Sequence, residues 1–107
     1  MIANLINQKK QRTVLSEFSM TGLGLHTGKE VNINIKPTNV NSGINFIRTD
    51  LNKDNVIKAL WSNVTNTNLC TTISNNKGVS VSTIEHLMSA LSGMHIDNAD
   101  VLIDNSE

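Results

Sequence analysis

The sequence predicts an α+β two-layer sandwich in which one helix covers a largely antiparallel sheet. Apolar and polar side chains alternate strictly over Val31–Lys36, as in a half-buried strand. Other short apolar segments are separated by loops rich in Asn and Gly, which favours hairpins. A helical pattern is strong only over residues 82–92. The 107 residues suffice for one domain and leave no room for two independent cores.

The composition predicts an aliphatic core and argues against nucleic acid as a partner. Hydrophobic residues make up 38% of the chain, but aromatic residues only 3%. Nine basic and nine acidic side chains cancel, so no overall field attracts a polyanion. The few aromatic residues are not interleaved with Lys or Arg, which disfavours a surface on which bases stack.

The sequence predicts a protein that stays soluble inside the cell, without a transmembrane segment. No run of about 18 apolar residues occurs. Residues 1–10 lack the apolar region of a signal peptide. A single cysteine, Cys70, cannot form an internal disulfide, which suits a reducing compartment.

The first half of the chain predicts three strands. Arg12–Phe18 alternates and is the first plausible strand. Thr21–Gly28 holds three glycines in eight residues, which indicates a bend or irregular loop. Val31–Lys36 is the clearest strand, and turn residues separate it from the apolar segment Ile44–Ile47. We expect Val31–Lys36 and Ile44–Ile47 to form a hairpin.

The second half predicts a second hairpin, a helix and a closing strand. Asp54–Trp61 fits a short helix by spacing and fits an extended segment equally well. Leu69–Ser74 and Val79–Val81 flank Asn75–Gly78, whose residues tolerate a positive φ, so we expect a hairpin there. Ala99–Ile103 is a closing strand.

The helix begins with the spacing of a capping box. Ser82 stands at the N-cap position and Glu85 three residues further on. We expect the helix to end at about Leu91 or Ser92, with Gly93 at its C-terminal end.

A helical wheel divides this helix into a core face and an outward face. The apolar stripe consists of Ile84, Leu87, Met88 and Leu91. His86 points almost directly away from this stripe, and Glu85 lies on the adjoining flank. An imidazole beside a carboxylate can be a Zn²⁺ ligand together with its general base. The alternative is that Glu85 is only a capping residue and His86 only a solvated side chain.

The remaining candidate ligands do not complete a zinc site by spacing. The order Glu-His and the residues that follow it do not form the H-E-x-x-H pattern. A catalytic zinc takes three protein ligands, and the other histidines are His26 and His95, of which His95 is out of phase with His86. Cys70 has no base near it in the sequence and is expected to be a small core or surface residue rather than a nucleophile.

Three segments together resemble a known enzyme family. They are Gln11-Arg12-Thr13, the run Thr-Gly-Leu-Gly-Leu-His-Thr-Gly at 21–28, and Ser-Thr-Ile-Glu-His-Leu-Met-Ser-Ala-Leu at 82–91. They closely resemble the N-terminal half of UDP-3-O-acyl-N-acetylglucosamine deacetylase, the zinc enzyme of lipid A biosynthesis, and thus of lipopolysaccharide, in Gram-negative bacteria. The resemblance spans nearly the whole chain, including Ile96-Asp97-Asn98 and the closing strand.

This resemblance implies a cytoplasmic hydrolase that removes acetate from UDP-3-O-(3-hydroxyacyl)-N-acetylglucosamine. In that family two similar α+β sandwiches pack with their helices facing each other, and the active site lies between them. The resemblance implies that His86 is a zinc ligand and that Glu85 is the general base. It also places His26 near the active site and Cys70 close to the cleft, without assigning a chemical role to either.

The resemblance further implies that residues 1–107 are a partial first domain. The other zinc ligands, a histidine general acid and a threonine that stabilises the oxyanion belong to a second, C-terminal domain. Glu107 matches the start of the family segment E-I-P-x-x-D-G-S, and the second helix of the first domain follows that segment. We therefore expect this chain to be inactive alone and to expose apolar surface that favours self-association. The resemblance also favours the extended form of Asn55–Trp61.

A rival interpretation is a non-catalytic α+β module that binds another protein. Its motivation is the small, weakly charged outward face of the helix. That face consists of Ser89, Ala90, Ser92 and Gly93.

Overall fold

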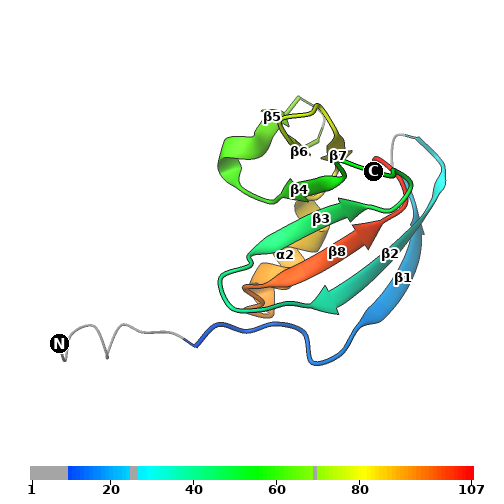
Figure 1. Cartoon of the computed structure of the whole chain (residues 1–107). Helices are drawn as coiled ribbons and strands as arrows, with labels where there is room; N and C mark the ends of the chain where they lie inside the picture. Colours follow the sequence, from blue (N-terminus) through cyan, green and yellow to red (C-terminus); the bar gives the residue numbers. More distant parts are fainter. Residues whose placement is uncertain (1–9, 25–26, 69) are drawn as a thin grey trace.

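The computed structural model describes residues 10–24, 27–68 and 70–107. Their elements, in chain order, are β1 (Phe18–Leu23), β2 (Glu30–Pro37), β3 (Ile44–Arg48), β4 (Val56–Lys58), the 3₁₀ turn η1 (Trp61–Asn63), β5 (Val64–Asn66), β6 (Thr72–Ser74), β7 (Ser80–Ser82), the helix α2 (Glu85–Gly93) and β8 (Ala99–Ile103) (Figure 1).

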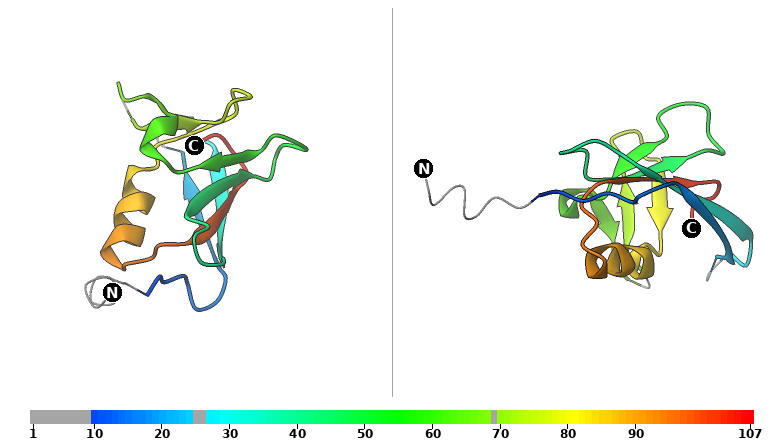
Figure 2. Two further views of the ribbon diagram at one scale, coloured as in Figure 1. Left: turned by 60° about the vertical axis from the view of Figure 1, so that its left-hand side comes forward. Right: turned by 90° about the horizontal axis from the view of Figure 1, so that it is seen from below.

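The described strands form two sheets. The larger sheet has five strands in the order β1-β2-β8-β3-β4, and the smaller has three in the order β5-β6-β7. All pairs are antiparallel except β3 with β8. The helix α2 lies along one face of the larger sheet, as the two views in Figure 2 show. The predicted fold class, an α+β sandwich with a mostly antiparallel sheet under one helix, is confirmed.

The alternating segment is a strand, as predicted. β2 runs one residue beyond Val31–Lys36 at each end. Val31 and Ile35 are buried, whereas Asn32 between them is exposed. Side chains of alternate residues point to opposite faces of a sheet, so this pattern places the Val31 side of β2 against the core.

The predicted hairpin between the second and third strands is wrong. β8 lies between β2 and β3, and the hairpin partner of β2 is β1. The connection from residue 38 to 43 instead bonds to the chain that precedes β8, because the amide of Gly43 donates to Asn98 Oδ1 at 2.8 Å. Ala99, Val101 and Ile103 of β8 are buried. A strand in the middle of a sheet is more completely covered than an edge strand, which agrees with the place of β8 between β2 and β3.

The predicted first strand at Arg12–Phe18 is also wrong. This segment forms a single bridge, from Thr13 to Asn98, and β1 begins only at Phe18. Arg12 bonds to the same segment before β8, since its amide donates to Asp97 Oδ2 at 2.9 Å. β1 continues through Leu23, so the first three residues of the bend predicted at Thr21–Gly28 belong to a strand. Residues 25 and 26 of that segment lie outside the described range.

The extended form of Asp54–Trp61 and the second hairpin agree with the structure. Of the two forms predicted for Asp54–Trp61, helical and extended, the structure has the extended one, because Val56–Lys58 is the strand β4. β6 and β7 form the second predicted hairpin, although Leu69 lies outside the described residues. Asn75 closes its turn, because its Oδ1 accepts from the amides of Lys77 and Val79.

The core lies between the larger sheet and α2, continues to the smaller sheet, and is mainly aliphatic, as predicted. The buried apolar residues are Val14, Val31, Ile35, Phe46, Ile57, Ile73, Val81, Ile84, Leu91, Ala99, Val101 and Ile103. Phe46 is the largest of them, and the other two aromatic residues, Phe18 and Trp61, are exposed. Burial of these side chains is the main stabilising contribution to the fold.

Asp104 anchors the chain after β8 to the outer face of β2. Its Oδ1 accepts from the amide of Asn32 at 2.8 Å, and its Oδ2 accepts from the side chain of Asn32 at 2.8 Å. The backbone hydrogen bond from Asn32, followed by the side-chain bond, lowers the pKa of Asp104. Both bonds favour the ionised carboxylate, so the folded state holds this group charged more readily than the unfolded chain does.

We therefore expect Asp104→Asn to destabilise the protein at pH 7 but not in acid. A lowered folded-state pKa contributes stability above the unfolded value, about 3.9, and that contribution is lost as the pH falls through the folded value. Urea unfolding at pH 7 and at successively lower pH should show a difference between the two proteins of about 1 kcal/mol at pH 7. That difference should shrink below the unfolded-state pKa of about 3.9 and be lost only below the lowered folded-state pKa of Asp104. The matched control is Asp54→Asn, at an exposed position with φ of 53°, which Asn tolerates. A difference that does not shrink as the pH falls below about 3.9 would contradict this account.

Candidate active site

The start of α2 differs from the predicted capping box. The helix begins at Glu85, its N-cap is Ile84, and no side chain caps it. Ser82 belongs to β7, where its hydroxyl shares a hydrogen bond of 2.9 Å with Thr72 Oγ1. The amide of Ser82 donates to the carbonyl oxygen of Ser106 at 2.8 Å, which keeps Ser82 in the strand. Ser82 is therefore a strand residue and Glu85 is free for another role.

The two faces of α2 are those that the helical wheel predicts. Its apolar stripe packs on the sheet, with Ile84 and Leu91 buried and Leu87 and Met88 partly buried. His86 is exposed on the opposite side. The helix ends at Gly93, which agrees with the prediction within two residues.

Glu85 is held in place by the backbone of Thr71. Its Oε1 accepts from the Thr71 amide at 2.5 Å, and the side chain is half-buried. This backbone hydrogen bond is the main cause that lowers the pKa of Glu85. The carboxylate is thus an ionised acceptor fixed beside the exposed His86, rather than a freely solvated group.

Thr71 also bonds to the backbone of Thr83, and we call its two bonds, to Thr83 and to Glu85, the clamp of the helix start. The amide of Thr83 donates to the carbonyl oxygen of Thr71 at 2.9 Å, so Thr71 bonds the chain on both sides of the start of α2. Thr83 has a φ of 60°, which is strained for a β-branched residue. Its buried hydroxyl has no hydrogen-bond partner among the described residues. Such strain is concentrated at functional sites in proteins.

The other predicted site residues are placed as follows. Cys70 is half-buried beside Thr71, and its Sγ lies 3.9 Å from Thr72 Oγ1. The structure therefore brings the chain around Cys70 next to Glu85. His26 lies outside the described residues. His95 is exposed beyond the far end of α2.

The start of α2 fits one nitrogen ligand of a metal ion with a carboxylate beside it. His86 is exposed, so its imidazole can be reached by a metal ion. Within residues 10–24, 27–68 and 70–107, no group of three or more His, Cys, Asp and Glu side chains is gathered as for a metal ion. An imidazole beside a carboxylate is compatible in its donor chemistry with a zinc ligand and its neighbouring base.

One cavity of the structure lies away from Glu85 and His86. It has a volume of about 570 Å³ and lies at the C-terminal end of α2, where Arg12, Met88 and His95 are among the residues that line it. Glu85 and His86 instead lie on open surface.

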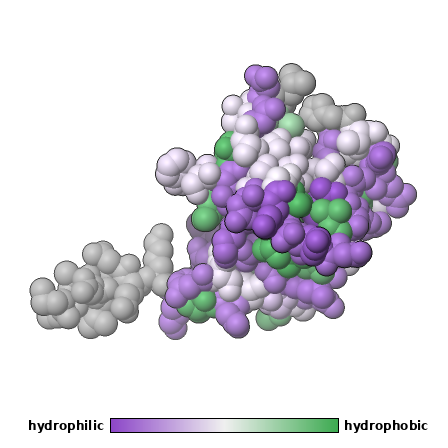
Figure 3. Space-filling view, turned by 45° about the horizontal axis from the view of Figure 1, so that its top comes forward, coloured by the Kyte–Doolittle hydropathy of each residue, from purple (hydrophilic) through white to green (hydrophobic). Residues whose placement is uncertain are grey.

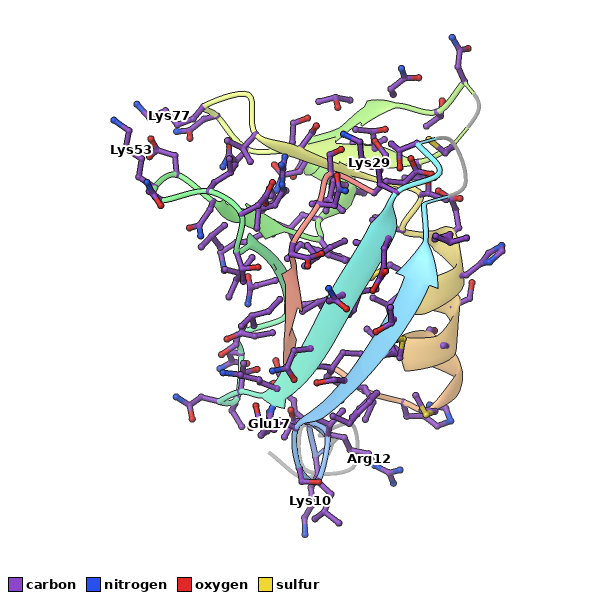
Figure 4. The ribbon with its side chains drawn as sticks, turned by 90° about the vertical axis from the view of Figure 1, so that its right-hand side faces the viewer. Lys10, Arg12, Glu17, Lys29, Lys53 and Lys77 are labelled. Atoms are coloured by element: carbon purple, nitrogen blue, oxygen red, sulfur yellow. The ribbon has the colours of Figure 1, made fainter. Side chains whose placement is uncertain are left out.

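Five of the basic side chains that the structure describes lie at two different ends of the molecule. Lys10 and Arg12 lie at one end of the molecule, and Lys29, Lys53 and Lys77 at the other (Figure 4). The face in Figure 3 is mostly hydrophilic, with smaller apolar areas. Among the described residues, no helix has both the length and the apolar character that crossing a membrane requires.

The comparisons with known proteins agree on one family. The family model described as UDP-3-O-acyl N-acetylglycosamine deacetylase (LpxC) matches residues 11–107. UDP-3-O-acyl-N-acetylglucosamine deacetylases of Shewanella loihica and Shewanella halifaxensis are each 47% identical over 97 residues, which cover 91% of this chain and 32% of the relative. That of Shewanella baltica is 46% identical over the same coverage. The chain spans about a third of the length of these curated relatives. By this match it belongs to the UDP-3-O-acyl N-acetylglycosamine deacetylase family.

Proposed function

We propose that this chain is the N-terminal part of a zinc-dependent deacetylase of lipid A biosynthesis. Its substrate is UDP-3-O-(3-hydroxyacyl)-N-acetylglucosamine, and its products are acetate and the free amine. The observation that carries the proposal is the Glu85-His86 pair at the accessible start of α2, with Glu85 fixed by Thr71. The names of the curated relatives support the substrate class.

Glu85 is the general base in this proposal. Its carboxylate takes a proton from the water that adds to the acetamide carbonyl carbon. The C–N bond then breaks, the nitrogen leaves with a proton as the amine, and the acetyl group leaves as acetate. The bond from the Thr71 amide keeps Glu85 in one orientation during this transfer, which lowers the entropy cost of reaching the reactive geometry.

His86 contributes one ligand to zinc through a ring nitrogen. Bound zinc supplies a Lewis acid that polarises the carbonyl and lowers the pKa of water. Because His86 is the neighbour of Glu85 at the start of a helix, one rigid element carries both groups.

The remaining ligands and the general acid come, in this proposal, from a C-terminal domain of the cytoplasmic enzyme. That domain faces the exposed side of α2, where small residues leave room for close packing. These residues are Ser89, Ala90, Ser92 and Gly93, all exposed. The 107-residue chain alone is then inactive, because it carries one ligand and the base only.

Exposed apolar surface at β1 also supports a longer protein. Phe18 and Met20 pair with Ile35 and Ile33 across the strands and so share the helix side of the sheet. Phe18 is 41% and Met20 42% exposed. Apolar side chains on this face are normally covered by a second layer, which α2 alone does not provide at β1.

A second candidate function is a non-catalytic module that binds another protein through α2. The same four exposed small residues favour it. The two functions differ in zinc binding and in release of acetate.

The first test is the zinc content of the 107-residue chain after exhaustive dialysis, with His86→Ala as control. We expect far less than one zinc per chain. One zinc per chain that is lost with His86→Ala would show that the chain completes the site, against the proposal. In the full-length protein we expect bound zinc and acetate release from UDP-3-O-acyl-N-acetylglucosamine. A full-length protein with neither would instead support the binding module.

A further inference from the structure

We infer that Glu107 is a positioning residue that fixes the connection between β1 and β2 to the end of the sheet where the Glu85 site lies. The connection is the segment from Gly24 to Lys29, of which Gly24 and residues 27–29 are described. The inference assigns a role to a carboxylate that the proposed reaction does not use. Its link to activity rests on the proposed function, whereas its structural basis does not.

The contact between Glu107 and the connection is direct. The amide of Thr27 donates to Glu107 Oε2 at 3.1 Å, across 80 residues of sequence. A hydrogen bond from a backbone amide to a carboxylate is stronger than one between neutral groups. Glu107 therefore provides a stronger acceptor for this amide than a neutral oxygen would.

Gly24 shows how closely Glu107 approaches. Gly24 is buried, and a Cβ atom added there would collide with Thr27 Oγ1 and would lie 3.3 Å from Glu107 Cδ. Only glycine leaves room for both groups. The Glu107 carboxylate is thus packed against the turn as well as hydrogen-bonded to it.

The turn also has bonds of its own. The amide of Gly28 donates to the carbonyl oxygen of Gly24 at 2.9 Å, and the amide of Gly24 donates to that of Lys29 at 2.9 Å. These bonds join Gly24 to Gly28 and Lys29, whereas the bond to Glu107 joins Thr27 to a distant part of the chain. Removal of Glu107 should therefore release the position of the connection and leave the rest of the sheet intact.

The residues before Glu107 connect it to the candidate site. The carbonyl oxygen of Ser106 accepts from the amide of Ser82 at 2.8 Å, three residues before Glu85. Asp104 is bonded to Asn32 of β2. Residues 104–107 thus contact β2, the connection and β7, and Figure 1 shows all three at the end of the molecule where the C-terminus lies.

Amide hydrogen exchange by NMR in the 107-residue chain tests this role. In Glu107→Ala we expect the Thr27 amide to exchange about tenfold faster, because its charged acceptor is lost. Glu107→Gln keeps an oxygen acceptor without the charge, so its Thr27 exchange rate should lie between those of Glu107→Ala and the original protein. Glu17→Ala removes an exposed carboxylate at the opposite end and should change nothing at Thr27. The amide of Val101, in the sheet centre, should be unaffected in all three.

Gly24→Ala provides an independent variant. The added methyl group displaces Thr27 or Glu107, so it should raise the exchange of the Thr27 amide while Glu107 is still present. An unchanged Thr27 rate in both Glu107→Ala and Gly24→Ala would overturn the inference. An equal increase at Val101 would also overturn it, because the carboxylate would then act only on global stability.

The link to activity is tested in the full-length protein. We expect Glu107→Ala to lower kcat/KM about tenfold with unchanged zinc content, and Glu107→Gln to restore most of it. Unchanged kcat/KM in Glu107→Ala would overturn a role in positioning the site. If the unaltered full-length protein released no acetate, the proposed function would fail, and the exchange rates would still decide whether Glu107 positions the connection.

Discussion

Glu85→Ala in the full-length protein is expected to lower acetate release by about 10²- to 10⁴-fold, the usual contribution of a general base. Zinc content should stay at the level of the unaltered protein, since Glu85 is not proposed as a ligand. His86→Ala should instead lose zinc, and activity with it. Zinc analysis and an acetate-release assay on the same samples separate the two effects.

The structure offers a sharper variant at the same position. Glu85→Gln retains an oxygen that accepts from the Thr71 amide, so the clamp of the helix start is preserved. An amide does not take the proton from water, so we expect the same loss of rate as in Glu85→Ala. A Glu85→Gln protein that works at full rate would show that Glu85 serves only to hold the loop at Thr71.

Phe46→Ala is expected to reduce the free energy of unfolding by about 3–5 kcal/mol. Phe46 is 1% exposed, and it pairs with Ile57 of β4 and with Val101 of β8 across the sheet. Its removal leaves a cavity in the hydrophobic core on the face of the sheet where Phe46 packs. Since domains of this size are stable by about 5–15 kcal/mol, the loss is a large part of the total.

Urea unfolding followed by circular dichroism measures this loss. The matched control is Phe18→Ala, which removes the same side chain from the exposed edge strand β1. We expect the control to cost less than about 1.5 kcal/mol, because about two fifths of that side chain is already exposed. Equal losses in the two variants would mean that the core does not depend on Phe46.

The burial of residues in alternating strands and on the faces of the helix was predictable, because the local spacing of apolar residues indicates which side chains face the core. Ala99–Ile103 is β8 with the bounds that the sequence indicates, and the wheel of α2 places His86 correctly on the exposed side. The pairing order was not predictable in this way. Which strand lies beside β2 depends on contacts between distant segments, such as that of Gly43 with Asn98, and these leave no local pattern.

The functional side chains of the candidate site were predictable from the sequence, but the hydrogen bonds that hold them in place were not. Glu85 and His86 stand out as neighbouring functional side chains, but Thr71 lies in a polar run without periodicity. Ser82 and Glu85 have the spacing of a capping box, yet Ser82 bonds to Ser106 and Glu85 to Thr71. Tertiary hydrogen bonds therefore replaced the local ones that the spacing predicts.

The central position of β8 has a consequence for how fast the protein folds. β8 is the last strand in the chain order, yet it lies between β2 and β3, and Ile33 pairs with Ile103. The larger sheet therefore forms only after loops that span most of the chain have closed, which slows folding. Until β8 is synthesised, β2 and β3 each present an unpaired edge to other nascent chains. Chaperone demand and aggregation during synthesis should thus depend on how quickly residues 99–103 reach their place.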